Sequence, residues 1–310
     1  MFTRREFLER GAVAVGLALR PGASLARSPQ SISGMCISLN SSLTRQLEWP
    51  EFARLAARVG YCGVDVNLNA AKAQGVDATR ALFNELTIRP TVTGLPVQFG
   101  GPTPPTDDSL KQLEDAAAFA STIGCPRMMA VLPPSAPSPK AEYRPIIKER
   151  VTAIAVILQR SNVRLGLEFL GPLHFRTRQP YEFIWRMDEA LELAKECGPN
   201  VGLTLDAWHW HHAGATVDDI LAAGKSRIVH VHVSDAKAMP PEDVRDNQRV
   251  MPGEGVIDLT AFFRALQKIG YEDGVSPEPL GRVPSDMSAE AGARQGLETT
   301  IAVMKKAGVI

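Results

Sequence analysis

The fold is decided by four short apolar runs, RLGLEF (164–169), VGLTLD (201–206), IVHVHVSD (228–235) and GVSPEP (274–279). At or near the end of each run stands an acidic or imidazole side chain, and we single out Glu168, Asp206, His232 and Glu278. Helix-like segments separate the runs, which indicates parallel strands joined by helices. Because the ends of parallel strands in a barrel meet on one face, these four side chains are predicted to lie close together.

The four side chains have the composition of a metal site. Two glutamates, one aspartate and one histidine are hard, mostly oxygen donors for one divalent cation. A single glutamate at a strand end is more often a solvated or capping residue, but four such positions in order favour a site. We predict a mononuclear centre that favours Mn²⁺ or Mg²⁺ and is also compatible with Co²⁺ or Zn²⁺.

The rest of the chain repeats the alternation of strand and helix. Further strands are expected at 32–39, 63–67, 88–95 and 127–131, and helices at 51–59, 78–86, 109–123, 144–160, 182–197, 217–223, 259–269 and 289–306. The pattern predicts an α/β fold, a (β/α)8 TIM barrel in a single domain at 27–310. An open doubly wound sheet is the alternative, but no GxGxxG follows the first strand. The longest loop, 234–255, falls on the catalytic face of such a barrel.

The first 26 residues have the layout of an export signal. Arg4 and Arg5 precede Phe7 and Leu8, an apolar stretch follows at 11–19, and residues 24–26 resemble a small-residue cleavage site. This order is typical of a twin-arginine signal peptide rather than an amphipathic helix. The apolar stretch is too short to span a membrane. We therefore expect a signal at 1–26, a periplasmic or otherwise exported protein, and no stable membrane anchor.

The charge balance argues against nucleic acid as a partner. Lys plus Arg and Asp plus Glu both number 34. Without residues 1–26, which hold four Arg and two Glu, 30 basic and 32 acidic residues remain, a net charge of −2. A nearly neutral protein lacks the basic surface that binds phosphate backbones.

The cysteines give an open prediction. Cys36, Cys62, Cys125 and Cys197 form no CxxC pair and show no metal-ligand spacing. Buried free thiols are the favoured interpretation, because Cys36 and Cys62 lie in or beside apolar runs. Export would permit a disulfide, so that alternative remains open.

Five motifs in order, GLEFLGP (166–172), LDAWHWH (205–211), HVHVSDA (230–236), RVMPGEG (249–255) followed by IDL, and SPEP (276–279), resemble a known superfamily. This is the sugar isomerase and epimerase superfamily with xylose-isomerase-like barrels, and the pattern is most similar to ketohexose 3-epimerases and inosose dehydratases. The resemblance covers about 32–310. It implies metal ligation by Glu168, Asp206, His232 and Glu278, and substrate contacts from His209 and Arg249.

The chemistry of isomerisation suits this residue set. Removing a C–H proton beside a carbonyl leaves an enediolate, whose two oxygens a divalent ion would stabilise as a Lewis acid. Glu168 and Glu278 would then act as acid and base as well as ligands. Further substrate contacts are predicted for Trp208, whose ring could stack on a sugar, and for His174. His230 lies two residues before His232 and is expected to pack in the barrel interior or to support its neighbour.

Other functions share parts of this pattern. A lyase or dehydratase acting on a 3-keto sugar, a 3-keto-glycoside or an inosose would use the same metal and the same proton abstraction. An AP endonuclease-type nuclease would need histidines from earlier strands, whereas all six histidines lie between His174 and His232. A non-catalytic sugar binder does not need both Glu168 and Glu278. The expected partner is a small, free carbohydrate, and a homo-oligomer is compatible with the sequence.

Overall fold

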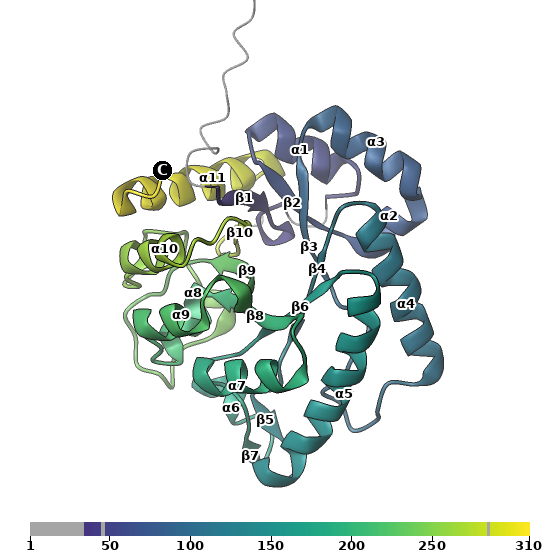
Figure 1. Cartoon of the computed structure of the whole chain (residues 1–310). Helices are drawn as coiled ribbons and strands as arrows, with labels where there is room; N and C mark the ends of the chain where they lie inside the picture. Colours follow the sequence, from purple (N-terminus) through teal and green to yellow (C-terminus); the bar gives the residue numbers. More distant parts are fainter. Residues whose placement is uncertain (1–33, 45–46, 284–285) are drawn as a thin grey trace, which may run out of the picture.

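In this computed structural model, eight parallel strands form a closed barrel with the order β1-β10-β9-β8-β6-β4-β3-β2. Figure 1 shows how the labelled strands are arranged. Residues 34–44, 47–283 and 286–310 are described. The strands are β1 (Cys36–Leu39), β2 (Gly63–Val66), β3 (Arg89–Gly94), β4 (Arg127–Val131), β6 (Arg164–Glu168), β8 (Val201–Asp206), β9 (Ile228–Val233) and β10 (Gly274–Pro277). The predicted (β/α)8 barrel is confirmed, while the signal segment predicted at 1–26 lies outside the described residues.

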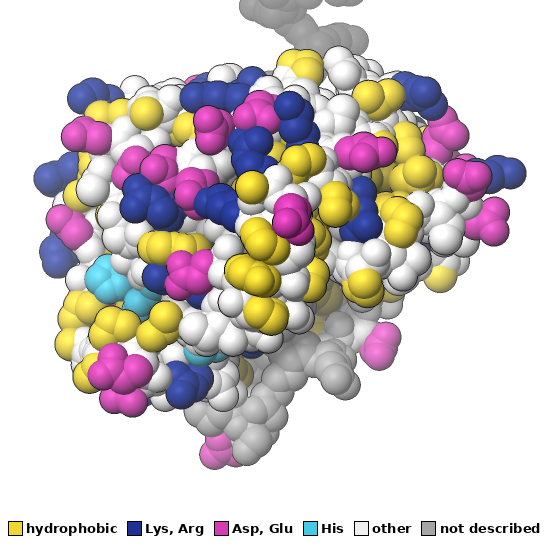
Figure 2. All heavy atoms as spheres, turned by 90° about the horizontal axis from the view of Figure 1, so that it is seen from below, with side chains coloured by type: hydrophobic (Ala, Val, Ile, Leu, Met, Phe, Trp, Pro, Cys, Tyr) yellow, Lys and Arg dark blue, Asp and Glu magenta, His cyan; other side chains and the backbone are white. Residues whose placement is uncertain are grey.

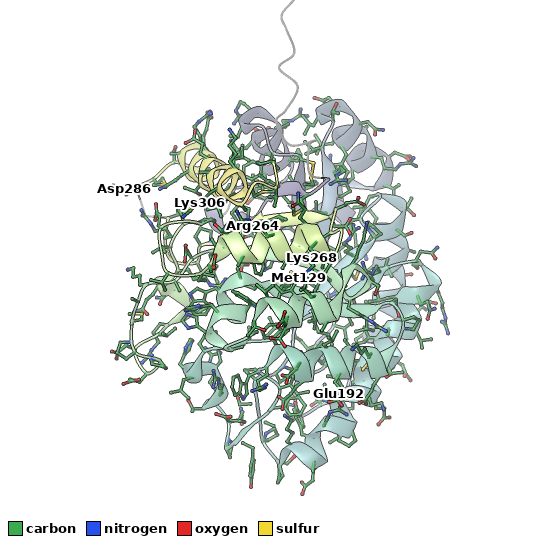
Figure 3. The ribbon with its side chains drawn as sticks, turned by 60° about the vertical axis from the view of Figure 1, so that its left-hand side comes forward. Met129, Glu192, Arg264, Lys268, Asp286 and Lys306 are labelled. Carbon is green, nitrogen blue, oxygen red and sulfur yellow. A yellow bond between two sulfur atoms is a disulfide. The ribbon has the colours of Figure 1, made fainter. Side chains whose placement is uncertain are left out.

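Helices surround the barrel (Figure 1). They are α1 (Glu51–Val59), α2 (Leu68–Gln74), α3 (Val76–Leu86), α4 (Asp107–Thr122), α5 (Lys140–Arg160), α6 (Leu173–Arg176), α7 (Met187–Cys197), α8 (Ala207–His212), α9 (Val217–Ala223), α10 (Leu259–Lys268) and α11 (Ala289–Ala307). Arg264 of α10 donates to the carbonyl of Ala307 at the end of α11, which ties the last two helices together (Figure 3). Within the described ranges, every helix is too short or too polar to cross a lipid bilayer.

One predicted helix starts later than expected. The helix predicted at 182–197 begins at Met187, because Tyr181–Glu182 forms β7 and pairs antiparallel with β5 (Ser135–Ala136). This small ladder joins two loops that are far apart in sequence, so local periodicity does not reveal it. The short helices α2, α6 and α8 were also not predicted.

The barrel interior is polar at the level of the predicted site. His232 is the register partner of Asp206 on one side and of Ser276 on the other. Val229, Val231 and Val233 alternate with His230 and His232 along β9, and all five are buried. Since successive strand residues point to opposite faces, the valines pack under the helices while the two imidazoles point into the barrel.

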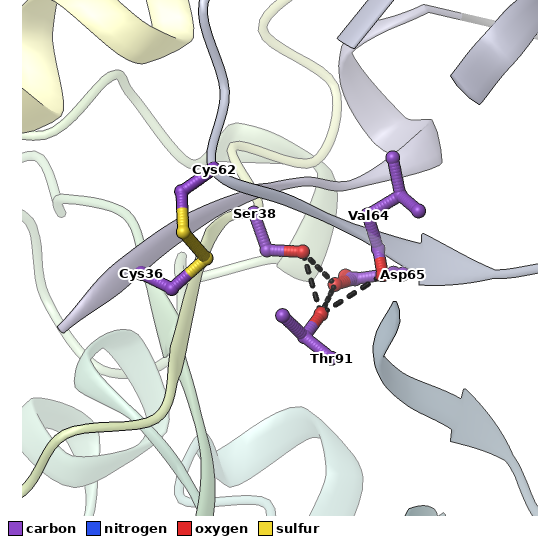
Figure 4. The surroundings of a disulfide bond; sticks show 6 residues. All are labelled: Cys36, Ser38, Cys62, Val64, Asp65 and Thr91. Atoms are coloured by element: carbon purple, nitrogen blue, oxygen red, sulfur yellow. Dashed lines mark hydrogen bonds between the residues drawn. A yellow bond between two sulfur atoms is a disulfide. The ribbon is translucent and has the colours of Figure 1, made fainter. Parts of the chain in front are cut away.

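The structure overturns the favoured interpretation of two cysteines. Cys36 and Cys62 form a disulfide with a Cα–Cα distance of 5.3 Å (Figure 4). The backbone N–H of Cys62 donates to the carbonyl of Ile37 at 3.0 Å, because β1 and β2 are neighbours in the barrel. Cys125 and Cys197 are free and buried, as expected.

Candidate active site

The four predicted metal ligands converge inside the barrel. Glu168, Asp206, His232 and Glu278 each place one candidate ligand atom within 4.8 Å of the others. Nδ1 of His232 lies 3.0 Å from Oε1 of Glu168 and 3.5 Å from Oε2 of Glu278. Because β6 and β9 are not adjacent, the contact between Glu168 and His232 crosses the barrel interior.

Backbone bonds beyond the strands fix two of these side chains. The N–H of Glu278 donates to the carbonyl of Val233 at 2.9 Å, so the chain stays beside β9 after β10 ends. Asp206 is the N-cap of α8, and its Oδ1 accepts the N–H of Trp208 at 2.7 Å. Because Oδ1 forms this cap, Oδ2 of Asp206 is free to contact other side chains of the site.

The loop after β9 is held in place by Asp235, a buried carboxylate. Its backbone exchanges two hydrogen bonds with Val250, at 2.9 and 3.0 Å. Its side chain accepts the N–H groups of Ala236 (2.8 Å), Ile257 (2.9 Å) and Gly253 (3.1 Å). These bonds fix both ends of the loop, and they place Arg249 beside the four converging side chains.

Arg249 joins the carboxylates to the predicted substrate-binding residues. Its guanidinium donates to Oδ2 of Asp206 at 2.6 Å and to Oε2 of Glu278 at 3.2 Å. It also lies 3.2 Å from Nε2 of His209 and 4.6 Å above the ring of Trp208. All of these groups except Glu278 are buried. Asp246 also accepts from the guanidinium at 2.8 Å, so Arg249 is held as a fixed positive charge next to three acids.

The remaining predicted substrate contacts lie apart from the cavity beside the site. This cavity, of about 270 Å³, is bounded by His232 and Glu278 and by side chains of the β1 to β4 side, namely Asn40, Ser41, Leu47, Trp49, Phe52, Asp65, Val66, Asn67, Val92, Thr93, Gly94 and Met129. Trp208 is buried against Arg249, and the ring of His174 packs on Phe175 at 4.1 Å. The substrate roles assigned to His174, Trp208, His209 and Arg249 therefore stay predictions.

Sequence reasoning missed the opposite wall of this cavity. Asp65 belongs to the apolar run GVDVN (63–67), so an acid within a strand was the available signal. Trp49 and Asn40 carried no such signal in the sequence, because they lie in loops and the residues around them in the fold are distant in sequence. His230 lies where it was expected, in the interior, with Nε2 2.9 Å from the hydroxyl of Ser276.

The electrostatics of the site combine burial with close opposite charges. Burial raises the pKa of Glu278 to about 7, against the opposing influence of His232 and Arg249. Burial alone would lower the pKa of His232, but Glu278, Glu168 and Asp206 raise it to about 10. Burial also opposes ionisation of Asp206, yet Arg249 and His209 hold its pKa below the usual range. A cation entering the site would therefore compete with a proton on His232.

The residues present fit one divalent cation. Three carboxylates and one imidazole converge, and the imidazole directs Nδ1 towards two of the acids. Nε2 of His232 is buried and has no hydrogen-bond partner, so only Nδ1 is committed to the acidic cluster. Oxygen-rich sets of this kind suit Mg²⁺ and Mn²⁺, while the imidazole also suits Zn²⁺.

The closed parallel barrel and the cluster of three carboxylates and one imidazole place this protein among the α/β-barrel proteins with a candidate mononuclear metal centre. Comparison of the sequence with known protein families identifies the family. Residues 53–306 match the family described as xylose isomerase-like TIM barrel, and the chain belongs to it. The resemblance read from the five motifs is thereby confirmed.

Several individual members of known function or structure are similar to this chain. The inosose isomerase of Bacillus velezensis is 31% identical over 168 residues, which is 54% of this chain and 58% of the relative. The alignment thus spans little more than half the length of this curated relative. A xylose isomerase domain protein from Alicyclobacillus acidocaldarius has 29% identity and a TM-score of 0.80, covering 88% of this chain and 99% of its own.

Two further solved structures resemble this chain, and one of them contains a metal. The IolI protein, solved with a bound zinc atom, has 25% identity and a TM-score of 0.73, covering 88% of this chain and 99% of its own. An L-ribulose 3-epimerase is 16% identical with a TM-score of 0.66, covering 88% of this chain and 96% of its own, and shows the shared fold alone. The inosose isomerase relatives are enzymes, in line with the prediction of an enzyme.

Proposed function

We propose that this protein is a metal-dependent sugar isomerase or epimerase that moves a proton beside a carbonyl group. The observation that carries the proposal is the pair of carboxylates, Glu168 and Glu278, that approach one ring nitrogen of His232 at 3.0 and 3.5 Å. Two acids arranged around one candidate cation position suit removal and return of a proton. The inosose isomerase relatives support the same reaction class.

The protein's own groups supply most of the chemistry. Glu278, with its pKa raised to about 7 by burial, is suited to exchange a proton near neutral pH. Glu168 is the second carboxylate that would give a proton back. A divalent ion held by the four residues would supply Lewis-acid stabilisation of negative charge on the substrate oxygens. Arg249 adds a fixed positive charge that needs no reorientation during the reaction.

The three carboxylates support Mn²⁺ or Mg²⁺ as the bound ion. Zinc is the alternative that has an independent observation, because the IolI protein was solved with a zinc atom. Elemental analysis of the purified protein should find about one divalent ion per chain. Three tightly held zinc ions would contradict a mononuclear site and favour a nuclease.

The reaction is tested by proton exchange. Metal-loaded protein is incubated in deuterated water with ketoses, inososes and 3-keto-glycosides, and NMR follows deuterium at the carbon beside the carbonyl. We expect deuterium incorporation together with an isomerised or epimerised product. Exchange with loss of a leaving group would establish the lyase alternative instead. Absence of exchange with every compound would contradict the proposal.

We also propose that residues 1–26 are a cleaved twin-arginine signal, that 27–310 is the mature barrel domain, and that the protein is exported. The Cys36–Cys62 disulfide supports export, because such bonds persist mainly in oxidising compartments. Replacing Arg4 and Arg5 by lysine should leave uncleaved precursor in the cytoplasm, as seen by fractionation and immunoblotting. Normal export of this variant would refute the twin-arginine route.

A further inference from the structure

The cavity beside the candidate metal centre has a second acidic group. His232 and Glu278 bound one side of it, and Asp65 of β2 lies on the wall formed by β1 to β4. One oxygen of Asp65 and one ring nitrogen each of His230 and His232 lie within 4.8 Å of one another. Asp65 is therefore close enough to touch the same small molecule as the proposed catalytic groups.

Neutral donors surround the carboxylate of Asp65. Oδ1 lies 2.8 Å from the hydroxyl of Ser38 and 3.0 Å from that of Thr91 (Figure 4). It also lies 2.7 Å from the hydroxyl of Ser276. Oδ2 accepts the amide of Asn40 at 2.9 Å. The ring of His230 is 3.9 Å away, and its Nε2 lies 2.9 Å from the hydroxyl of Ser276. Among the described residues, no Lys or Arg forms an ion pair with Asp65.

This arrangement leaves Oδ2 of Asp65 able to accept one more hydrogen bond. A carboxylate oxygen can accept two hydrogen bonds, and among the residues that the structure describes Oδ2 accepts one, from the amide of Asn40. The side chain of Asp65 is 15% exposed and lines the cavity, so a ligand can reach it. The Cys36–Cys62 disulfide joins the start of β1 to the residue before β2, close to Asp65 (Figure 4). The strand that carries Asp65 is thus cross-linked to its neighbour β1.

The other walls complete a site for a polyhydroxylated molecule. Trp49, Leu47, Val92 and Met129 contribute apolar surface to the cavity, and Met129 is labelled in Figure 3. Apolar side chains suit the C–H faces of a sugar or cyclitol ring, while a carboxylate recognises its hydroxyl groups. Charged acceptors bind hydroxyl donors more strongly than neutral ones do.

We propose that Asp65 is a specificity-determining residue that accepts a hydrogen bond from a substrate hydroxyl remote from the reacting carbonyl. The substrate class is a neutral polyol ketone, either a keto-cyclitol or a ketose, with at least one hydroxyl beyond the pair of oxygens at the metal end. The inference rests on the proposed function, because it assigns the substrate of the same cavity.

The test measures binding, not turnover. Calorimetry with metal-loaded full-length protein uses 2-keto-myo-inositol, D-fructose and D-psicose as probes, together with monodeoxy analogues of the tightest binder. Asp65→Asn should weaken the tightest binder about tenfold to a hundredfold, as expected for a hydrogen bond to a charged group. Asp115→Asn, which removes an exposed aspartate from α4, is the matched control and should change nothing.

The analogues separate substrate recognition from a structural role. One monodeoxy analogue should bind the wild type more weakly than the parent compound does, by the same factor that Asp65→Asn costs the parent compound. Asp65→Asn should not reduce the affinity for this analogue further, because the interacting hydroxyl is already absent. Equal binding of all analogues by the wild type would overturn the proposal, and this comparison needs no variant. So would a uniform loss for all analogues in Asp65→Asn, or failure of the wild type to bind any neutral probe at millimolar concentration.

Proton exchange in deuterated water, followed in parallel, keeps the two proposals apart. Binding that depends on Asp65 without any exchange would refute the proposed function and leave the recognition site in place. Exchange by the wild type together with unchanged affinity in Asp65→Asn would refute the recognition site alone.

Discussion

Replacing Arg249 by methionine removes the positive charge that pairs with Asp206, Glu278 and the more exposed Asp246, and it keeps most of the apolar stem. The side chain of Arg249 is 2% exposed, that of Asp206 is 0% and that of Glu278 is 18% exposed. The guanidinium lies 2.6 Å from Asp206 and 3.2 Å from Glu278, so water hardly screens either contact. Breaking a buried ion pair by removing one partner costs about 3–5 kcal/mol, because the other charge stays buried.

The structure places the expected loss near the lower end of that range. Asp206 keeps the N–H of Trp208 as a donor, and Glu278 keeps His232 at 3.5 Å. Glu278 can also take up a proton, since burial already raises its pKa to about 7. We therefore expect a loss of about 3 kcal/mol, which corresponds to a fall in Tm of roughly 5 °C for a domain of this size.

Urea unfolding with and without a divalent metal measures this effect. Arg282→Met is the control, because the pair of Arg282 with Glu254, at 3.3 Å, is 35% and 36% exposed and should contribute less than about 1 kcal/mol. Added Mn²⁺ or Mg²⁺ should restore part of the stability of Arg249→Met, since ligand binding to the folded state stabilises it. A loss below about 1 kcal/mol in metal-free buffer would refute this account of the buried charges.

Three further outcomes are expected. Glu278→Gln should retain metal and lose a factor of about 10²–10⁴ in turnover in the proton-exchange assay, and near-normal turnover would leave Glu278 as a ligand only. Metal affinity should rise with pH by up to about tenfold per unit between about pH 7 and 9, because above the pKa of Glu278 and below that of His232 the ion must displace the one proton that the acids hold on His232. Calorimetry that finds a flat profile would contradict this. Changing Cys36 and Cys62 to serine should cost about 3.5 kcal/mol in denaturant unfolding for a separation of 26 residues. Free thiols in the wild type would exclude the bond.

Much of the fold could be predicted because strand ends are fixed by backbone geometry. Once eight apolar runs alternate with helical patterns, a parallel barrel brings the last residues of its strands to one face. Glu168 and Asp206 end their strands, and Glu278 follows β10 directly. Their convergence with His232 therefore follows from the order of elements, without knowledge of side-chain packing.

Features that depend on neighbours in space could not be predicted in this way. The Cys36–Cys62 bond requires that Cys62 lie beside β1, which the hydrogen bond to Ile37 shows and the spacing does not. The pairing of β5 with β7 joins two loops whose sequences carry no common signal. The position of Arg249 depends on Asp235, whose carboxylate ties together backbone groups on both sides of the loop.

Asp65 shows why the residue type alone does not assign a role inside a barrel. Asp206 and Asp65 are both acids on strands whose side chains reach the interior, yet their surroundings differ. Asp206 faces the guanidinium of Arg249 and the cluster around His232, where charges converge and a cation is stabilised. Asp65 faces three hydroxyls and an amide, which satisfy a carboxylate without any cation. The donors around each acid, not its place in the strand, favour metal binding for one and hydroxyl recognition for the other.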